Sequence, residues 1–430
     1  MRWTAYPREI AKTEFFLQEN PTMLFVGIDQ HKRHLTVCIR DEQGNVSLRR
    51  QVSTKWENVD PFLASLQERG TAHGGYVAVV EVCGFNGWLV KRLEAWGCKR
   101  VYVISAPVRV RQKTDRRDAA KLSELLWINR DRIAAGQKLV HVSVVYQPTE
   151  EEQYDRQLTH LRLRLGQAST RVKNSTKGIL RRHNLEQECP TKGGFTQAAL
   201  RWLRIVQLPQ LDRLELDMRL TQYRVYAMQL ADVALMIEKR AEQNAEVPRV
   251  RTMPRVGAYT ALALVAHIGS IERFCHARSL SNYFGIAPGC RNSGDTDRPG
   301  AITKAGHPFI RFLLAQTVLH ALRGDPGLRR WYQRVKRRRG SKVARVAVMR
   351  RLCESLWHML SKKEDYRFVD GNTLLRARKL ADRQPKAMSS KGSWNYFLEV
   401  IRTPGEFGAD FFEWDGEGSG EYSRMRRGYR

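Results

Sequence analysis

Four acidic residues in the first third of the chain constrain the fold most, because of where they stand. Asp29 and Glu81 each end a short apolar run of the kind that forms a buried strand. Asp115 and Asp118 are spaced i, i+3, so on a helix they would lie on one face. Clustered carboxylates are typical ligands of divalent cations. The sequence therefore predicts a domain in which two strand ends and one helix bring four carboxylates to a metal-binding site.

The charge of the chain indicates what such a site would act on. Its 430 residues include 74 Lys and Arg against 44 Asp and Glu, a formal net charge of +30. A surface this basic attracts polyanions, and its binding to nucleic acid would depend strongly on salt. A phosphodiester is then the natural substrate, because two Mg²⁺ ions can neutralise a reacting phosphate. The same charge would also suit a basic nucleic-acid-binding scaffold without catalytic activity.

Cysteine usage and hydropathy argue against a disulfide-bonded, secreted or membrane protein. The seven cysteines are scattered, with no C-x-x-C pair and no Cys/His cluster at zinc spacing. We therefore expect reduced thiols in a cytoplasmic protein. No secretory apolar segment occurs near the N-terminus, and no run of about 18 apolar residues occurs anywhere, so we expect no membrane partner.

The segment from 23 to 106 has the pattern of an α/β domain. Strands are predicted at 23–29, 35–40, 46–52, 76–82 and 100–104, and helices at 61–69 and 87–96. The second and third strands flank the turn 41–45 and suggest a hairpin. The order β-β-β-α-β-α-β, with acids ending the first and fourth strands, is typical of an RNase H-like nuclease core.

From residue 150 the pattern changes to long helices. One heptad seam runs through Tyr154, Leu158, Leu161, Leu165, Ala168, Val172, Ser175 and Ile179. A second runs through Leu211, Leu214, Met218, Thr221, Val225, Met228 and Leu235. The two helices can fold back as an antiparallel hairpin or pair with another copy of the chain, and an ordinary bundle core is an equal alternative.

The C-terminal half adds candidate nucleic-acid contacts. The segment 254–269 is similar to a helix-hairpin-helix element, although it has only Gly257 of the usual glycine pair. Trp331 and Tyr332, whose rings could stack on bases, lie at the start of a basic run without acidic residues. The run comprises Arg329, Arg330, Arg334, Lys336, Arg337, Arg338, Arg339, Lys342 and Arg345. The region after about 371 lacks apolar periodicity, and we expect it to be mobile.

Ser293 lies in a glycine-rich stretch with several cations nearby in sequence. These cations are Arg291, Arg298, Lys304 and Arg311. Cations beside a hydroxyl can hold a phosphate in line and stabilise the charge that develops as the hydroxyl attacks. Taken from the residues alone, a simple Ser-Gly turn with cations that bind the DNA backbone passively is favoured over a nucleophile.

The motifs, taken in order, resemble the DEDD transposases of the IS110 insertion-sequence family, which are related to the Piv-type DNA invertases. The resemblance covers roughly 23–323 and rests on Gly27-Ile-Asp29 with His31-Lys32, the Glu81 strand, 113–119, 253–274, Ser293-Gly294, Lys304-Ala-Gly306 and Ile310-Arg311. The turn at Gly257 departs from the family by lacking the second glycine.

This resemblance implies a mechanism. Asp29, Glu81, Asp115 and Asp118 would bind Mg²⁺, or Mn²⁺ in its place, and Ser293 would attack the scissile phosphate to form a phosphoserine link to DNA. A non-coding bridge RNA would pair with donor and target DNA and direct the exchange. The active site would be composite, built by dimers that meet as a tetramer, in a prokaryotic cytoplasm in association with the nucleoid.

The residue patterns and the resemblance together predict a domain plan and a set of nucleic-acid contacts, of which residues 1–22 and those after about 323 lie outside the resemblance. We expect an N-terminal extension (1–22), a RuvC-like DEDD domain (23–145), a helical coiled-coil arm (146–247), a mainly helical transposase domain (248–365) and a C-terminal tail (366–430). The residues expected to contact nucleic acid are Lys32, Arg291, Arg298, Lys304, Arg311, Arg329, Arg330, Arg337, Arg338 and Arg339. The rival function is a RuvC-like structure-specific endonuclease that uses metal-activated water, with Ser293 structural.

Overall fold

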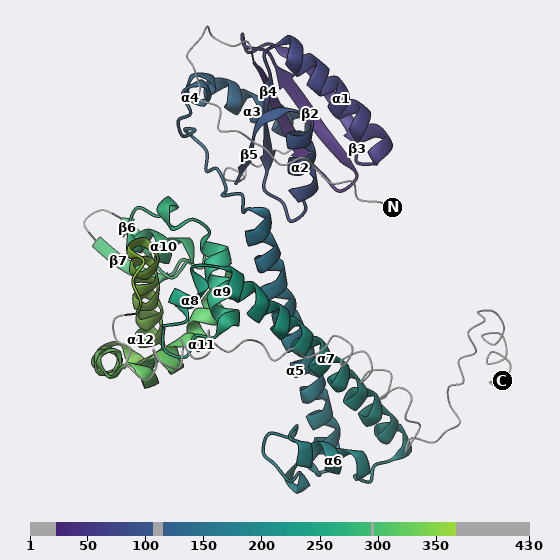
Figure 1. Cartoon of the computed structure of the whole chain (residues 1–430), viewed down its shortest axis with the longest axis vertical. Coiled ribbons are helices and arrows are strands. Elements are labelled where there is room, and N and C mark those ends of the chain that lie inside the picture. Colours follow the sequence, from purple (N-terminus) through teal and green to yellow (C-terminus); the bar gives the residue numbers. More distant parts are fainter. Residues whose placement is uncertain (1–22, 106–114, 294–295, 367–430) are drawn as a thin grey trace, which may run out of the picture. The chain divides into compact units, whose positions relative to one another are not determined.

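A computed structural model describes residues 23–105, 115–293 and 296–366, with side chains except at 115–116 and 290–299 (Figure 1). The chain forms two compact units that divide after Thr149, and each is described by itself. The predicted N-terminal extension and nearly all of the predicted C-terminal tail lie outside the described residues. Among the described helices, none is both long and apolar enough to cross a bilayer.

The first unit is built on a five-stranded mixed sheet, as the strand pattern predicted. Its strands are β1 (Leu24–Gln30), β2 (His34–Arg40), β3 (Val46–Ser53), β4 (Tyr76–Glu81) and β5 (Cys98–Ile104). Their order across the sheet is β3-β2-β1-β4-β5. The first three strands are antiparallel, whereas β4 runs parallel to β1 and to β5. The crossovers to parallel strands need helices, and these cover the sheet.

Helices cover both faces of this sheet. On one face, α1 (Trp56–Ala72) and α2 (Gly87–Ala95) pack against the side chains of Val26 and Ile28. On the other face, α3 (Asp115–Ile128) packs its Leu122 and Leu126 against side chains of β1, β4 and β5. Alternate residues of each strand thus enter different cores, because successive side chains point to opposite faces. A short helix, α4 (Arg130–Ala134), follows α3.

Helix α1 begins earlier than predicted. The sequence predicted a start at Pro61, since proline lacks the N–H that a helix interior uses. The helix instead starts at Trp56 and includes Pro61 on its exposed side. Burial of Val59, Phe62 and Leu66 at helical spacing favours the longer helix, and Pro61 removes only one hydrogen bond near its beginning.

The second unit begins with a helical hairpin. Helices α5 (Glu150–Arg182) and α7 (Gln210–Gln243) pack side by side, and α6 (Gln197–Ile205) lies in their connection (Figure 1). Arg240 pairs with Asp155 at 2.7 Å, and Arg182 pairs with Asp212 at the other end. The start of one helix therefore meets the end of the other, so the pair is antiparallel.

Only part of the predicted seams forms the contact between these helices. On α7 the buried side chains are those of Leu216, Leu220, Val233, Ile237 and Ala241. The predicted seam of α7 is instead largely exposed, at Leu211, Leu214, Met218, Val225 and Leu235. The predicted seam of α7 is therefore not the row that packs on α5, and its pairing with another copy of the chain stays a prediction. Heptad spacing marks an apolar row on a helix without saying what covers it.

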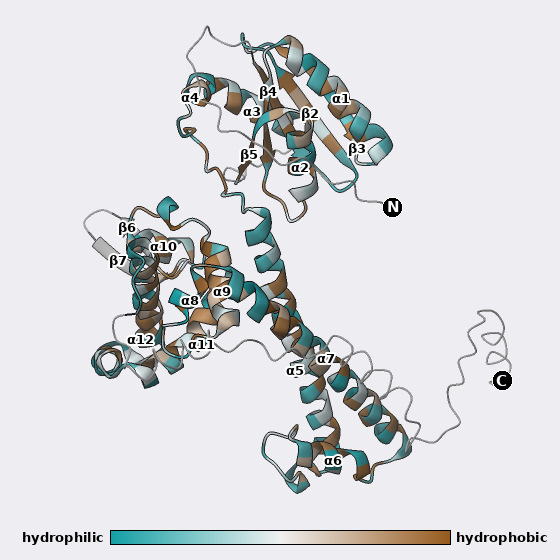
Figure 2. Cartoon of the chain, viewed as in Figure 1, coloured by the Kyte–Doolittle hydropathy of each residue, from teal (hydrophilic) through white to brown (hydrophobic). Residues whose placement is uncertain are grey.

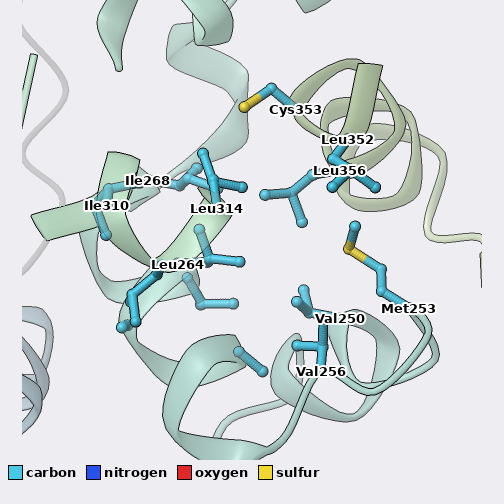
Figure 3. Packing of buried hydrophobic residues seen from close by; sticks show 14 of the residues in the cluster. Val250, Met253, Val256, Leu264, Ile268, Ile310, Leu314, Leu352, Cys353 and Leu356 are labelled. Carbon is cyan, nitrogen blue, oxygen red and sulfur yellow. The ribbon is translucent and has the colours of Figure 1, made fainter. Parts of the chain in front are cut away.

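The rest of the second unit is mainly helical, as predicted. It comprises α8 (Val247–Val250), α9 (Ala258–Ile268), η2 (Ile271–Arg273), α10 (Ala277–Tyr283), the hairpin of β6 (Pro288–Ser293) and β7 (Thr296–Ile302), α11 (Pro308–Gly324) and α12 (Pro326–Lys362). A short 3-10 turn, η1 (Glu186–Glu188), lies earlier, between α5 and α6. One core joins α8, α9, α11 and α12, where Val250, Leu264, Leu314 and Leu356 point toward one another (Figure 3).

Helix α9 lies inside that core. It is among the most hydrophobic helices (Figure 2), and nine of its eleven residues are buried. A helix buried on nearly all sides is typical of a core element rather than of a DNA-reading one. Gly257, at its N-terminus, is exposed, so the predicted phosphate contact there stays a prediction.

Helix α12 carries the basic run. It bends at Gly340, whose φ of 80° favours glycine, and the cations of the run are exposed on both sides of the bend. Tyr332, however, is buried in the core, and Trp331 packs against it with Arg351 over the ring at 5.0 Å. The expectation that Tyr332 stacks on bases was therefore wrong, because its ring fills the helical core.

Candidate active site

Asp29 and Glu81 lie at adjacent strand ends. The parallel pairing of β1 with β4 matches Leu24 to Tyr76 and continues to Ile28 and Val80. Asp29 and Glu81 are the next residues on their respective strands. Neighbouring strands are about 4.8 Å apart, so the two acids leave the sheet side by side.

Both acids also belong to the same face of the sheet. Phe25, Val77 and Val79 contribute to the core beneath α3. Because alternate residues share a face, Asp29 follows Phe25 and Glu81 follows Val79 on the side that α3 covers. The two carboxylates therefore share both an edge and a face of the sheet.

Helix α3 runs so that its beginning approaches those acids. Ala119 and Ser123 lie directly against Gly27, whereas Trp127 donates a 2.9 Å hydrogen bond to the carbonyl of Glu42, at the opposite end of the sheet. The helix is thus antiparallel to β1. From Gly27 to Asp29 the strand advances about 6.6 Å, which corresponds to about four helical residues. The helix segment four residues before 119–123 is 115–119, which contains Asp115 and Asp118.

The close contact at Gly27 permits this approach and gives a test. A Cβ at Gly27 would lie 2.3 Å from the Ser123 nitrogen and 2.4 Å from the Ala119 oxygen, both helix backbone atoms that cannot move alone. We expect Gly27→Ala to displace α3, to lower the free energy of unfolding by about 1–3 kcal/mol and to weaken metal-dependent DNA cleavage. Urea unfolding of the full chain measures the first effect.

A matched control for this substitution exists in the same unit. Gly87→Ala should leave stability nearly unchanged, because a Cβ at Gly87 would meet nothing within 4 Å. Equal unfolding midpoints for the Gly27 and Gly87 variants would contradict the proposed packing of α3 on β1.

The surroundings of the acids include residues that the sequence did not single out for a role. The Asp29 side chain is 14% exposed and its Oδ2 lies 3.1 Å from Nε2 of His31. Asn86, which is buried, donates a 2.7 Å hydrogen bond to the carbonyl of Glu81 and accepts one from the Cys83 nitrogen. Asn86 thus fixes the loop that follows Glu81. The Asn-Gly pair before a helix was the signal in the sequence that could have found it.

The remaining acids and Ser293 are placed as follows. Asp118 is half-buried on α3, and Asp115 is the first residue of that helix. Ser293 ends β6 in the second unit, where it pairs with Thr296 across the hairpin. The side chains of Asp115 and Ser293 lie outside the described residues.

The predicted nucleic-acid contacts differ in their surroundings. Exposed cations are Lys32, Lys304, Arg329, Arg330, Arg337, Arg338 and Arg339. Two of the predicted cations bind backbone carbonyls: the exposed Arg329 donates to Leu322 at 2.7 Å, and the half-buried Arg311 donates to Phe284 at 3.1 Å and to Gly306. Arg311 therefore holds the loop that follows the β6–β7 hairpin. Arg291 and Arg298 face each other in the register of that hairpin, and their side chains are outside the described residues.

Comparison with known proteins agrees with this organisation. A model of DEDD transposases of the IS110 type matches residues 26–185, which include β1, β4 and α3. A second model, for transposases of the IS116/IS110/IS902 family, matches residues 247–333, which include the β6–β7 hairpin.

Whole proteins match over most of the chain as well. The transposase for insertion sequence element IS1111A of Coxiella burnetii is 26% identical, over 80% of this chain and 91% of its own length. A protein of Pseudomonas aeruginosa named "Probable family 20 transposase" is 24% identical, over 80% of this chain and 98% of its own. The two family models match the chain in the expected order, and the two relatives match it over most of their own length. Both comparisons therefore indicate a transposase. The chain is thus similar to insertion-sequence transposases, with a DEDD-type N-terminal part and a C-terminal part that matches the IS116/IS110/IS902 family.

Proposed function

We propose that this transposase is a metal-dependent, RNA-guided serine recombinase that exchanges strands between donor and target DNA. Asp29, Glu81, Asp115 and Asp118 would hold Mg²⁺, and the hydroxyl of Ser293 would attack the scissile phosphate. In this step an O–P bond forms at Ser293 and the 3′ or 5′ oxygen of the cut strand leaves. Attack by a DNA hydroxyl on the phosphoserine then rejoins the strands and releases the serine.

One observation carries the proposal: Asp29 and Glu81 end adjacent parallel strands on the face that α3 covers. Hard carboxylate oxygens are the donors that Mg²⁺ prefers, so these residues fit the ion. When bound, Mg²⁺ supplies stabilisation of the charge on the attacked phosphate. The strand order β3-β2-β1-β4-β5 with acids at the central strand ends supports an RNase H-like fold for this unit.

The position of Ser293 supports a role as nucleophile. It ends a strand at the tip of a hairpin, with Arg291 and Arg298 paired across the two strands. A serine at a hairpin tip can approach a DNA strand, and nearby guanidinium groups would orient a phosphate. These residues belong to a different unit from the acids, so a composite active site requires the two units, of one chain or of two, to meet on DNA.

The helical hairpin supports assembly into dimers and tetramers. Its exposed row of Leu211, Leu214, Met218, Val225 and Leu235 leaves apolar surface on α7. Large exposed apolar rows on soluble helices are typical of helix–helix interfaces. We propose that this row pairs with another copy of the chain and that paired arms bring the serine of one protomer to the acids of another.

The experiment that tests this function is a cleavage assay with the full chain, a plasmid that carries the ends of the element, and RNA transcribed from those ends. With Mg²⁺ we expect nicked DNA covalently attached to protein, and we expect EDTA to abolish both products. Omission of the RNA should abolish site-specific cutting while leaving DNA binding intact. Free DNA ends without any adduct would favour the endonuclease that uses metal-activated water. Binding without cleavage under every condition would overturn the enzymatic proposal.

A further inference from the structure

Three histidines from three separate segments of the chain meet in the second unit. They are His160 on α5, His267 on α9 and His307, which immediately precedes α11. One ring nitrogen of each lies within 4.8 Å of one nitrogen of both others. Among the described residues, this is the one group of three or more His, Cys, Asp or Glu side chains with such convergence. The cluster is remote in sequence from the predicted metal site, which uses carboxylates of the first unit.

The orientation of His267 is fixed by the backbone. Its Nδ1 lies 2.8 Å from the carbonyl of Ala263, and because a carbonyl only accepts, Nδ1 must carry the proton. Nε2 of His267 then has a free lone pair. This residue is 4% exposed, so water reaches it poorly. Histidine ligands of metal ions usually donate their second ring N–H to a carbonyl or carboxylate in this manner.

The protonation of the cluster suits a ligand set. Burial lowers the pKa of His267 to about 3, with further contributions from His307 and Arg156. Burial, followed by Arg164, lowers the pKa of His160, and burial, followed by His160 and then by Arg156 and Arg311, lowers the pKa of His307. All three rings are therefore neutral near pH 7, and neutral imidazole is the form that binds metal.

Nearby cations restrict which ions could bind. Arg156 lies beside the cluster, with its guanidinium turned to the carbonyls of Ala266 and His267 at 2.8 and 3.5 Å. Arg164 and Arg311 also act on the cluster electrostatically. Hard ions held mainly by charge, such as Mg²⁺ or Ca²⁺, would be repelled without a carboxylate. A borderline transition-metal ion, bound through nitrogen lone pairs, needs no anionic ligand.

We propose that His160, His267 and His307 form a binding site for a transition-metal ion, with Zn²⁺ the natural occupant and water in the fourth position. Zinc–nitrogen bonds of about 2.0–2.1 Å in a tetrahedron require nitrogens about 3.4 Å apart. The ring nitrogens now lie within 4.8 Å of one another, and small rotations of the partly exposed His160 and His307 side chains would shorten these distances to the required value.

The site would connect elements that matter for the hairpin bearing Ser293. His307 follows Gly306, whose backbone packs so tightly on Tyr283 that an added Cβ would lie 2.1 Å from the Tyr283 carbonyl. That loop leads directly from β7 to α11. A metal ion there would join the base of the β6–β7 hairpin to α9 and to the arm helix α5. We infer that metal binding fixes the hairpin relative to the arm.

Metal titration of the tag-free full chain, first stripped with a chelator, tests this proposal. Zn²⁺ binding is measured by calorimetry, Co²⁺ binding by visible absorption of the nitrogen-coordinated ion, and stability by thermal unfolding. We expect one Co²⁺ site with tetrahedral-type absorption and a rise in the unfolding midpoint on addition of Zn²⁺. His307→Ala and His160→Gln should each weaken Zn²⁺ binding at least about a hundredfold.

A matched control separates this site from ordinary surface histidines. His276, exposed in the same unit, should tolerate replacement by alanine with unchanged affinity. Because His267→Ala could disturb the core, the partly exposed His307 and His160 are the decisive positions. The proposal is overturned if the wild-type chain shows no such Co²⁺ spectrum, or if Zn²⁺ affinity is the same in both histidine variants as in the wild type. The cluster would then be an aromatic contact that packs on Phe309, whose ring centroid lies 4.5 Å from that of His160.

Discussion

Replacement of Ser293 by alanine is expected to abolish the covalent protein–DNA adduct and to slow strand cleavage on the order of 10⁴-fold or more. Loss of a nucleophile removes the bond-forming atom itself, which no neighbouring group replaces. Binding of DNA and RNA should persist, because the exposed cations of α12 and the arm are untouched. Denaturing gels of end-labelled DNA measure the adduct, and filter binding measures affinity.

Thr296→Ala provides the control for the serine variant. Thr296 pairs with Ser293 across the hairpin, so this change also removes one hydroxyl from the same register position. We expect the threonine variant to form adducts at nearly the wild-type rate. If Ser293→Ala instead cut DNA as fast as the wild type, Ser293 would be structural and water the nucleophile.

Replacement of Asp29 by asparagine or Glu81 by glutamine is expected to reduce metal-dependent cleavage by about 10³-fold or more. Each amide keeps the shape of the side chain but lacks the charge that holds a divalent cation, and metal stabilisation of a reacting phosphate is worth several kcal/mol. Folding should be retained, because both residues stand at strand ends rather than within a core. Cleavage rates across a Mg²⁺ titration measure the effect.

Asp131→Asn is the matched control for the acids. Asp131 belongs to the same unit, and its side chain is 86% exposed on α4. Its amide variant should cleave at the wild-type rate at every Mg²⁺ concentration. Normal cleavage by the Asp29 and Glu81 variants would remove the basis for a carboxylate metal site.

Much of the first unit could be predicted from the sequence, since local patterns specify its strands. The predicted strand 23–29 appears as Leu24–Gln30, and the predicted hairpin around 41–45 forms with Asp41 and Asn45 hydrogen-bonded at 3.0 Å. The start of α1 was missed because Pro61 was taken as a boundary, whereas burial of Val59 extends the helix before it.

In the second unit, the sequence predicted the positions of the long helices but not which of their side chains pack against one another. Long helices were predicted at the positions of α5 and α7, but the row on α7 that packs inside the chain is not the predicted heptad row. Tyr332 and Arg311 were both expected to contact nucleic acid. The structure places Tyr332 in the core, whereas Arg311 donates to the carbonyls of Phe284 and Gly306 and its contact with nucleic acid stays a prediction.

By itself, the sequence determined the strand ends that carry Asp29 and Glu81, the basic charge of the chain and its similarity to insertion-sequence transposases. Each of these features is carried by short stretches of sequence, which can be recognised without knowledge of the fold. Only the tertiary structure decided that α3 runs back along β1 toward those acids, and that His160, His267 and His307 meet. These arrangements depend on how helices pack in three dimensions, and residues far apart along the chain carry no local signal of such a meeting.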